Sequence, residues 1–354
     1  MCDLVIAGAG MAGLAAAATA VDLGADVVVH EKGPRPGGSM LLSSGVVWRH
    51  ATFEAFREEC PDGDEALQRV VWDGLPEALS WLEEIGASVT ERETANPRTW
   101  GVRFDTRSVT STLARRAGRV RLEQPLQALP DRAPVVLATG GFQANVDLVR
   151  EHVTPEADSL FLRATPWSTG DGLTLGLDAG GTTSSRLDEI YGRTMPATPR
   201  RIDPSRFVPL AQLYAHYATV EGSDGSLFES KTWSEIDVVQ WVARRPGARA
   251  RYVVSSDAVG TRVAGGRTIG ELIDAAEDVG ARVDRNGGTV AVDVVAGITT
   301  TLGGLAVDSR ARVAPGVYAA GGDIGGIANG GYASGLAAAL VLGRIAARSA
   351  LEER

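Results

Sequence analysis

The chain has 354 residues, of which 44% are apolar and 22% are charged, and its formal net charge is −9. A chain of this length and composition is expected to form about two globular domains with a large buried core. The negative charge argues against nucleic acid as a partner, because nucleic acid binding favours basic surfaces. With only two cysteines, no signal-peptide pattern and no apolar run long enough to span a bilayer, the sequence predicts a cytoplasmic protein without a disulfide framework or a membrane span.

The first forty residues have the pattern of a nucleotide-binding unit. Residues 4–7 form an apolar run that is too short for a helix and is followed by glycines, which predicts a buried parallel strand. An Ala-rich helix is predicted for 11–23, and a second strand for 26–30, which ends at Glu31. The loop at 8–13 has the spacing G-x-G-x-x-G. Strand, glycine loop, helix, strand and acid therefore occur in the order that dinucleotide binding requires.

Each glycine of this loop has an expected role. Gly8 makes the tight turn, Gly10 lets a pyrophosphate approach the backbone, and Gly13 allows helix and strand to pack closely. The helix start directs unpaired N–H groups and a positive dipole at the phosphates. Glu31 can accept both hydroxyls of an adenosine ribose, and it would repel a 2′-phosphate. Ala12 and Lys32 complete this part of the predicted cofactor site; the alternative is a Gly/Ala-rich packing motif without a ligand.

The hexapeptide alone does not distinguish NAD from FAD, but the loop after Glu31 does. A second glycine doublet, Gly37-Gly38, continues through small polar residues, and such a loop suits an extended ligand that reaches well beyond the ribose. This favours FAD, although a plain polar loop between structural units would look similar. The predicted cofactor contacts here are Gly38, Ser39, Ser43, Ser44 and Gly45.

Two further glycine turns are expected to reach the same ligand. The apolar run 134–138 predicts a buried strand, and it continues into Thr139-Gly140-Gly141. Because open α/β sheets bind ligands at the carboxyl ends of their strands, Ala138, Thr139 and Gly140 are placed against the cofactor. In the segment S-T-G-D-G at 168–172, Asp171 is interpreted either as a helix cap or as a further cofactor contact.

The C-terminal part returns to the same pattern. Residues 316–323 predict a short buried strand that ends in glycines, and a glycine-rich segment at 325–335 leads into a helix that continues to Ala347. The start of that helix could stabilise the anion of a reduced flavin through its dipole. The predicted cofactor contacts are Gly322, Asp323, Ser334, Gly335 and Leu336.

The middle of the chain differs in composition. From about Leu187 it is rich in proline, arginine and aromatic residues, with a partly alternating segment at 207–220 and a predicted helix at 234–245. We therefore predict an α/β protein with three segments: 1–186, the first part of a Rossmann-like FAD-binding domain; 187–288, a smaller α+β cap domain; and 289–354, the second part of the FAD-binding domain. Helices are also expected within 52–86 and 105–118.

Together these stretches resemble the flavoprotein family of fumarate reductase, the succinate dehydrogenase flavoprotein subunit and 3-ketosteroid Δ1-dehydrogenase. The matching segments keep the family's order and are G-A-G-M-A-G at 8–13, G-G-S-M at 37–40, A-T-G-G at 138–141, S-T-G-D-G at 168–172, T-L-G-G-L at 301–305 and P-G-V-Y-A-A-G-G-D-I-G-G at 315–326. The resemblance implies a GR2-type FAD domain split by a cap domain, with the substrate between them. It also implies hydride transfer between a substrate carbon and flavin N5, which forms or removes a C=C bond beside an electron-withdrawing group.

The departures from this family bear on the substrate. Fumarate reductases carry a His where this chain has Thr300, and they place a carboxylate-binding Arg in the approach to the last helix. Here no Arg or His lies between Val313 and Gly343. A dicarboxylate would therefore be bound with uncompensated charge. Family members that attach FAD covalently use a His where Ser39-Met40 stand here, so FAD is expected to be non-covalent.

Ketosteroid dehydrogenases instead use tyrosines and a glycine N–H that polarises a ketone. On this resemblance Tyr332 and the 330–335 amides are assigned to the ketone, and Tyr191 or Tyr214 to the partner acid or base. Thr300 is included in the predicted catalytic set because of its position before the T-L-G-G-L turn. For the aromatic residues of the middle block, a place in that domain's own core is the competing interpretation.

The sequence thus predicts an FAD-dependent oxidoreductase that forms or reduces a C=C bond α,β to a carbonyl, on an apolar ketone or a related small molecule. Alternatives are a fumarate reductase-like enzyme for a small carboxylate, using Arg193 or Arg251, and a flavin-binding protein that has lost catalysis. No metal site is predicted. The identity of the substrate, the direction of the reaction, the electron donor or acceptor and the oligomeric state do not follow from the sequence.

Overall fold

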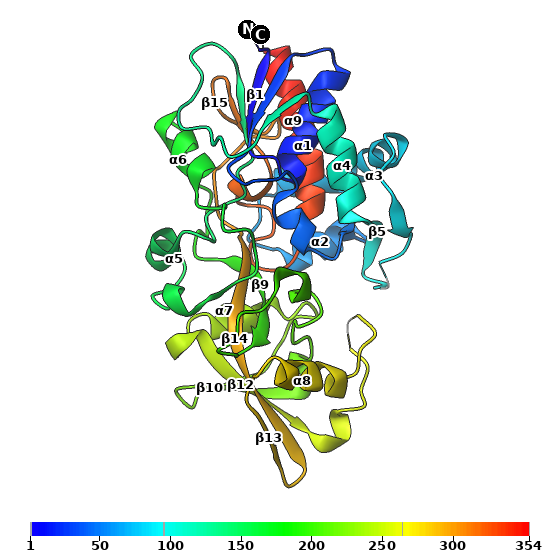
Figure 1. The fold of residues 1–354 in the computed structure, drawn as a ribbon, viewed down its shortest axis with the longest axis vertical. Coiled ribbons are helices and arrows are strands. Elements are labelled where there is room, and N and C mark those ends of the chain that lie inside the picture. Colours follow the sequence, from blue (N-terminus) through cyan, green and yellow to red (C-terminus); the bar gives the residue numbers. More distant parts are fainter. Residues whose placement is uncertain (1, 95, 264, 354) are drawn as a thin grey trace. The chain divides into compact units, whose positions relative to one another are not determined.

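The computed structural model of the chain describes residues 2–94, 96–263 and 265–353. The chain divides into two compact units. Unit 1 comprises the described residues within Met1–Asn145, Thr165–Glu189 and Thr300–Arg354, and unit 2 comprises those within Val146–Ala164 and Ile190–Thr299. Figure 1 shows the helices and strands of both units.

The main sheet of unit 1 is built from short strands, and its four inner strands are mostly buried. Its order is β15-β16-β7-β1-β2-β6, and all neighbours are parallel except β15 and β16. Apolar runs that are buried on both faces suit parallel strands, because helices cover them. The strands are β1 (Leu4–Ala7), β2 (Val27–His30), β6 (Arg119–Arg121), β7 (Val135–Leu137), β15 (Arg312–Ala314) and β16 (Val317–Ala319). This arrangement confirms the predicted α/β, Rossmann-like architecture.

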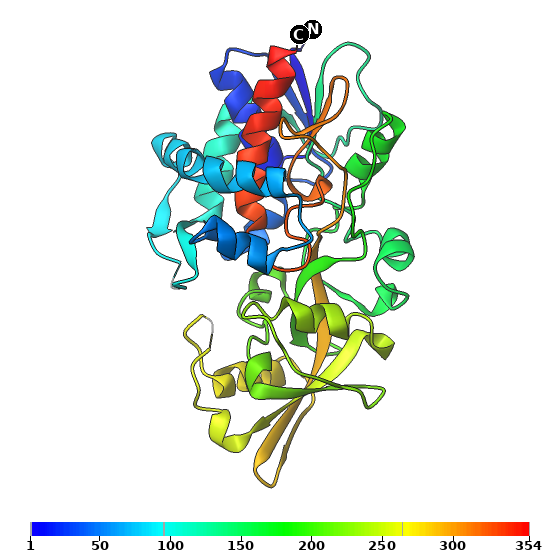
Figure 2. The same ribbon diagram turned by 180° about the vertical axis from the view of Figure 1, so that it is seen from behind.

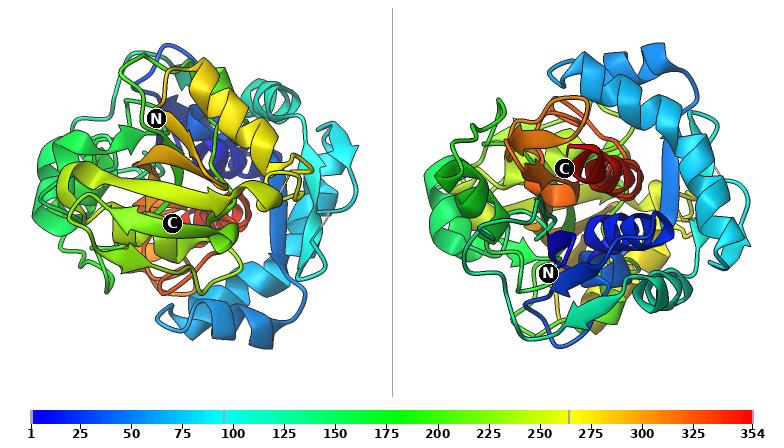
Figure 3. Two further views of the ribbon diagram at one scale, coloured as in Figure 1. Left: turned by 90° about the horizontal axis from the view of Figure 1, so that it is seen from below. Right: turned by 90° about the horizontal axis from the view of Figure 1, so that it is seen from above.

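Two helices with small residues pack closely in unit 1. They are α1 (Met11–Asp22) and α9 (Gly335–Glu352), which lie side by side in the views of Figure 3. At their contact, a Cβ on Gly343 would lie 2.4 Å from the carbonyl oxygen of Ala12. Only glycine at position 343 therefore lets the two helices approach this closely, and the backbone of Ala12 packs against α9.

The remaining elements of unit 1 surround this core. Helix α3 (Glu65–Glu84) crosses α9 (Figure 2). Arg344 of α9 donates to Glu77 of α3 over 2.9 Å. A small antiparallel sheet has the order β3-β5-β4. Its strands and the other helices are β3 (Val46–His50), β4 (Val89–Glu91), β5 (Thr99–Phe104), α2 (Phe53–Glu59), α4 (Thr106–Arg116) and α6 (Asp171–Asp178).

Unit 2 is centred on an antiparallel sheet with the order β11-β10-β12-β14-β13. The long strand β14 (Thr289–Thr301) also pairs with β8 and β9. The other strands are β8 (Phe161–Leu162), β9 (Ile190–Pro196), β10 (Ala218–Gly222), β11 (Leu227–Phe228), β12 (Arg249–Ser255) and β13 (Val283–Asn286), and the helices are α5 (Val146–His152), α7 (Ile236–Val242) and α8 (Ile269–Asp278).

The units differ in their bounds from the predicted domains. Unit 2 includes Val146–Ala164, because β8 within this segment pairs with β14 at Gly297 and Ile298. The return to unit 1 falls at Thr300, since residues up to Thr299 of β14 belong to the sheet of unit 2.

Several local predictions are confirmed and two are corrected. The segment 52–86 contains the two helices α2 and α3, and 105–118 contains α4. The predicted strand character of 207–220 was wrong for most of that segment: it is largely irregular, with β10 beginning only at Ala218. Asp171 does not cap α6, because the cap position is taken by Gly170 with φ +88° and Asp171 is the first helical residue.

Candidate functional site

Four loops of unit 1 meet at one edge of its main sheet. Strands β1, β2, β7 and β16 are parallel, so their carboxyl ends lie at the same edge. The chain leaves these ends at Gly8, Glu31, Ala138 and Ala320. All the glycine turns singled out in the sequence follow these strands or lie beside them.

The first loop has three glycines with three different surroundings. Gly8 has φ +102°, and a Cβ on it would lie 2.1 Å from the carbonyl oxygen of Ala138. A Cβ on Gly13 would lie 1.9 Å from the carbonyl oxygen of Gly8. Gly10, by contrast, has nothing within 4 Å of such a Cβ, and as the cap residue of α1 it makes no side-chain cap. This geometry agrees with the turn and packing roles of Gly8 and Gly13, and it leaves open space at Gly10.

Glu31 is buried at the end of β2. Its Oε2 accepts a hydrogen bond from the N–H of Ala9 (2.7 Å), and its Oε1 accepts one from the N–H of Gly33 (2.6 Å). The carboxylate is thus fixed directly beside the glycine loop. Each carboxylate oxygen has a second lone pair, so the group can still accept ligand hydroxyls.

Lys32 points to the S-T-G-D-G segment. Its Nζ donates to Thr169 Oγ1 (2.6 Å) and forms an ion pair with Asp171 at 3.0 Å. Lys32 and Asp171, both predicted to contact the cofactor, therefore bind each other and connect the end of β2 to the start of α6.

The second glycine doublet lies against the first loop. The N–H of Gly37 donates to the carbonyl oxygen of Ala9 over 2.7 Å, and a Cβ on Gly38 would lie 3.2 Å from Cα of Gly10. Ser39 Oγ accepts from the N–H of Thr165 over 3.1 Å. The structure thus brings Gly10, Gly38 and Ser39 together, as an extended ligand site requires.

The end of this loop makes mainly internal contacts. Ser43 Oγ donates to the carbonyl oxygen of Met40 (2.7 Å) and accepts from the N–H of Gly45 (3.1 Å). A Cβ on Gly45 would lie 2.2 Å from the carbonyl oxygen of Phe104, and Ser44 is exposed. Ser43 and Gly45 therefore shape the turn into β3.

Asp323 joins the turns that follow β7 and β16. Its carboxylate, 1% exposed, accepts from the N–H and the Oγ1 of Thr139 and from the N–H of Gly141. Burial raises the pKa of Asp323, and these donors oppose that shift. Gly322 lies beside Gly140, since a Cβ on Gly322 would be 2.8 Å from the carbonyl carbon of Gly140. The two turns are therefore locked together.

Two buried polar atoms near Gly141 lack a partner. Among the residues that the structure describes, Gln143 Oε1 and Thr301 Oγ1 make no hydrogen bond. They lie 2.9 and 2.7 Å from the position that a Cβ on Gly141 would take. Unsatisfied buried polar atoms are rare, so this spot is suited to a polar ligand atom.

The start of α9 is capped and accessible. Ser334 Oγ accepts from the N–H of Ala337 over 3.2 Å, as an N-cap side chain does. Gly335 is exposed, with nothing within 4 Å of a Cβ, and Leu336 is half-buried. The positive end of the helix dipole can act on a bound group here.

Tyr332, two residues before this cap, rests on the small sheet. Its ring centre lies 5.1 Å from that of Trp48. His50 Nε2 is 3.1 Å from the backbone carbonyl oxygen of Tyr332, and the His50 ring stacks on Phe56. Burial lowers the pKa of His50, which favours a neutral imidazole that donates to this carbonyl.

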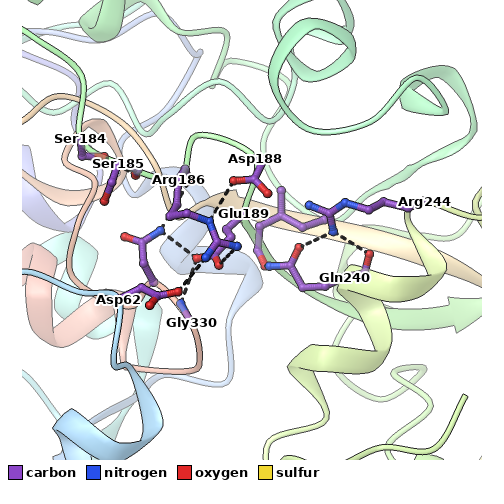
Figure 4. A network of polar contacts seen from close by, with 11 residues as sticks. Asp62, Ser184, Ser185, Arg186, Asp188, Glu189, Gln240, Arg244 and Gly330 are labelled. Carbon is purple, nitrogen blue, oxygen red and sulfur yellow. Dashed lines mark hydrogen bonds and ion pairs between the residues drawn. The ribbon is translucent and has the colours of Figure 1, made fainter.

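The buried carboxylate of Glu189 binds the loop that precedes α9 (Figure 4). Glu189 Oε2 accepts from Asn329 Nδ2 and from the N–H of Gly330, each over 2.9 Å. Its Oε1 pairs with Arg186 at 2.6 Å, and Arg186 also pairs with Asp62 at 2.6 Å. The loop that carries Tyr332 is thus fixed at several points.

The other predicted catalytic residues have different surroundings. Thr300, in unit 1, is half-buried, and its Oγ1 donates to the carbonyl oxygen of Thr301 over 3.2 Å. In unit 2, Tyr191 is half-buried, with Arg193 5.5 Å from its ring centre. Tyr214 is 0% exposed and packs edge-on against Tyr252 within unit 2, and burial raises the pKa of Tyr214. Because it is enclosed in unit 2, Tyr214 is poorly suited to exchange a proton with a substrate.

A family model described as FAD binding domain matches residues 3–129 and, overlapping with them, 102–336. The chain belongs to this family. The predicted family membership and the predicted FAD cofactor are thereby confirmed. Among the described residues, none of the helices combines the length and the hydropathy that crossing a membrane requires.

The residues present fit FAD. Its pyrophosphate would be held at the open side of Gly10 and the uncapped start of α1, and its adenosine ribose at Glu31. Gln143 and Thr301 offer unpaired polar atoms to the same ligand. Sequence reasoning missed these two residues and Glu189; for Gln143 the available signal was its position directly after A-T-G-G. The assignment of single residues to FAD stays a prediction.

This FAD-binding chain is similar to several known proteins. Fumarate reductase (cytochrome) of Shewanella frigidimarina is 25% identical over 230 residues, which cover 51% of this chain and 40% of that protein. The match therefore spans less than half of this relative's length.

Solved structures with a similar fold include the open conformation of a flavocytochrome c3 fumarate reductase, at 20% identity over 99% of this chain and 78% of that chain, with a TM-score of 0.72. They also include 3-ketosteroid delta1-dehydrogenase from Sterolibacterium denitrificans in complex with 1,4-androstadiene-3,17-dione, at 16% identity over 100% of both chains, with a TM-score of 0.75. At these identities the likeness concerns the fold.

Proposed function

We propose that the chain is an FAD-dependent oxidoreductase that forms or reduces a C=C bond α,β to a carbonyl, on an apolar ketone or a related small molecule. The observation that carries the proposal is the approach to α9: it presents Tyr332 and the capped start of a helix, while no Arg or His lies between Val313 and Gly343. A neutral acceptor suits this approach better than a dicarboxylate, whose charges would stay uncompensated.

In this approach, backbone groups at the start of α9 would act on the substrate carbonyl, and a side chain would transfer the proton. When bound, FAD supplies the hydride acceptor or donor at N5. The amide of Gly335 and the dipole of α9 would polarise the carbonyl oxygen of the substrate. Tyr332 would hold or move a proton at its Oη. Trp48, which is 6% exposed, packs beside Tyr332 and supports its ring.

The neighbour with 1,4-androstadiene-3,17-dione bound supports this substrate class, since an enone is the feature that the proposal requires. The same proposal treats the cofactor as non-covalent, because Ser39 and Met40 stand where covalent members of the family carry a His.

A second candidate, reduction of a small carboxylate, is favoured by the fumarate reductase relative and by Arg193. Within unit 2, Arg251 is committed to Asp284 and Asp293, so it is poorly suited to a substrate. Arg193 donates to the backbone oxygen of Ser234, and its charge opposes the raised pKa that burial gives to Glu235. Arg193 is therefore the cation to test.

Two variants distinguish these candidates, each assayed with a reduced dye as electron donor and with cyclohexenone or fumarate as acceptor. The proposal expects Tyr332→Phe to lower enone turnover by about 100-fold, the lower end of the effect of a general acid, without loss of FAD. It expects Arg193→Ala to leave enone turnover nearly unchanged. Fumarate turnover that disappears in Arg193→Ala would establish the second candidate, and unchanged turnover in Tyr332→Phe would remove Tyr332 from the catalytic set.

A further inference from the structure

An exposed tryptophan lies near Glu31, the residue predicted to bind the adenosine ribose. Trp167 precedes the S-T-G-D-G segment in unit 1 and is 40% exposed, whereas the next residue, Ser168, is buried. Its loop is held in place, because the carbonyl oxygen of Trp167 accepts from the N–H of Thr169 over 3.0 Å and Thr169 is bonded to Lys32. The partly exposed indole is thus held by a fixed loop.

The ring is close to the carboxylate assigned to the ribose. A Cβ on Gly33 would lie 2.8 Å from both Cδ1 and Nε1 of Trp167, and 3.0 Å from Oε1 of Glu31. Only glycine at position 33 leaves room for this arrangement, so the indole edge and the carboxylate flank the same point.

The chemistry of this place points to the base of the dinucleotide. Adenine is attached to the ribose whose hydroxyls Glu31 would accept, so an aromatic ring beside this carboxylate is suited to stack on the base. We propose that Trp167 forms the wall of the adenosine subsite and contributes to the preference of the chain for the adenine dinucleotide. Gly33 is then required for this wall, because any side chain there would displace the indole. The inference concerns the cofactor and is independent of the reaction proposed above.

Calorimetric titration of the apoprotein tests the proposal with FAD and with ADP, which carries the adenosine half alone. Trp167→Leu is expected to raise the Kd for FAD about tenfold, and the Kd for ADP by a similar factor, because stacking on a base contributes about this much affinity. Trp167→Phe keeps an aromatic face and should retain most of the affinity. The matched control is Trp100→Leu, which removes another exposed tryptophan, 45% exposed, on β5, and should change neither Kd.

Three results would overturn the proposal. The first is an unchanged Kd for FAD in Trp167→Leu. The second is a loss for FAD without a loss for ADP, which would place the effect on the flavin half. The third is an equal loss in Trp167→Phe together with a lowered melting temperature of the apoprotein, which would show that the indole only supports the loop.

Discussion

Gly10 and Gly13 illustrate how residues of one motif differ in what they do. A Cβ on Gly13 would collide with the carbonyl oxygen of Gly8, so packing within the protein requires glycine at position 13. A Cβ on Gly10 would meet no protein atom within 4 Å, and its φ of −77° is accessible to alanine. Packing within the protein therefore does not require glycine at position 10, and we propose that the ligand does.

This difference gives a prediction. Gly10→Ala should change the free energy of unfolding of the apoprotein by no more than about 0.5 kcal/mol, yet weaken FAD binding roughly tenfold or more, because the methyl group takes the place of the pyrophosphate. Gly13→Ala should destabilise the apoprotein by about 3 kcal/mol or more through overpacking. Urea unfolding and FAD titration measure both quantities.

Gly260→Ala is the matched control, since that glycine of unit 2 also has open space around a Cβ and lies far from the loop in sequence. It should affect neither stability nor FAD. Full FAD affinity in Gly10→Ala would contradict the assignment of the pyrophosphate to this loop.

The residues of the motif could be predicted because their spacing is local. Gly8, Gly13 and Glu31 lie within one strand-helix-strand unit, in which the spacing of the residues predicts their arrangement. The partner of Lys32 could not be predicted, since Thr169 and Asp171 follow 137 and 139 positions later. Gln143 and Thr301 were missed for the same reason: nothing local shows that they converge on Gly141.

At the scale of elements, the loop before α9 depends on contacts with other segments of unit 1. It is rich in glycine, which by itself would leave it conformationally free. Glu189, Gln68 and the backbone of Asp64 hold it through hydrogen bonds to residues 326–330. The sequence predicted a glycine-rich entry to the helix, but not this set of fixed points, because the partners lie in distant segments.

Glu189→Ala should therefore destabilise the protein by about 2–4 kcal/mol, since it removes the acceptor of the buried Asn329 side chain and of the Gly330 N–H, and also a partner of Arg186. Asp188→Ala, which removes a neighbouring and more exposed partner of Arg186, should cost about 1 kcal/mol or less. Urea unfolding of both variants provides the comparison. Equal losses in the free energy of unfolding would show that the hydrogen bonds of Glu189 stabilise the protein no more than the exposed ion pair of Asp188.

Strand β3 stabilises the same loop through His50, and this contact predicts a pH dependence. The pKa of His50 lies below its ordinary value of 6.5, because burial disfavours the imidazolium. The unfolded chain therefore binds a proton at this residue near pH 6.5 before the folded chain does. The stability that His50 contributes is complete above pH 6.5 and is lost as the pH falls toward the lower pKa of the folded state.

His50→Gln keeps a donor for the carbonyl of Tyr332 but does not titrate. Its melting temperature should fall less than that of the wild-type protein between pH 7.5 and pH 5.5, as differential scanning fluorimetry of the apoproteins would measure. Parallel curves for the two proteins would show that another group titrates in this range.

At the scale of the whole molecule, the chain passes between its two units at four places: after Asn145, after Ala164, after Glu189 and after Thr299. The change of composition near Leu187 lies close to the third of these passages. The first two could not be read from the sequence, because α5 and the two-residue strand β8 have no composition that distinguishes them from unit 1. Contacts with distant residues assign them to unit 2: β8 pairs with β14, and Thr154 donates to the carbonyl oxygen of Ala243.

The family and its cofactor followed from motifs spread along the chain, whereas the proposed substrate rests on the lack of Arg and His between Val313 and Gly343. The most direct test is anaerobic. The flavin of the purified protein is reduced with dithionite, and its absorbance is followed after addition of cyclohexenone, a steroid dienone or fumarate. The account predicts rapid return of the oxidised flavin band with at least one enone and not with fumarate. Rapid return with fumarate alone would contradict it and would show that other cations, such as Arg193, bind the substrate.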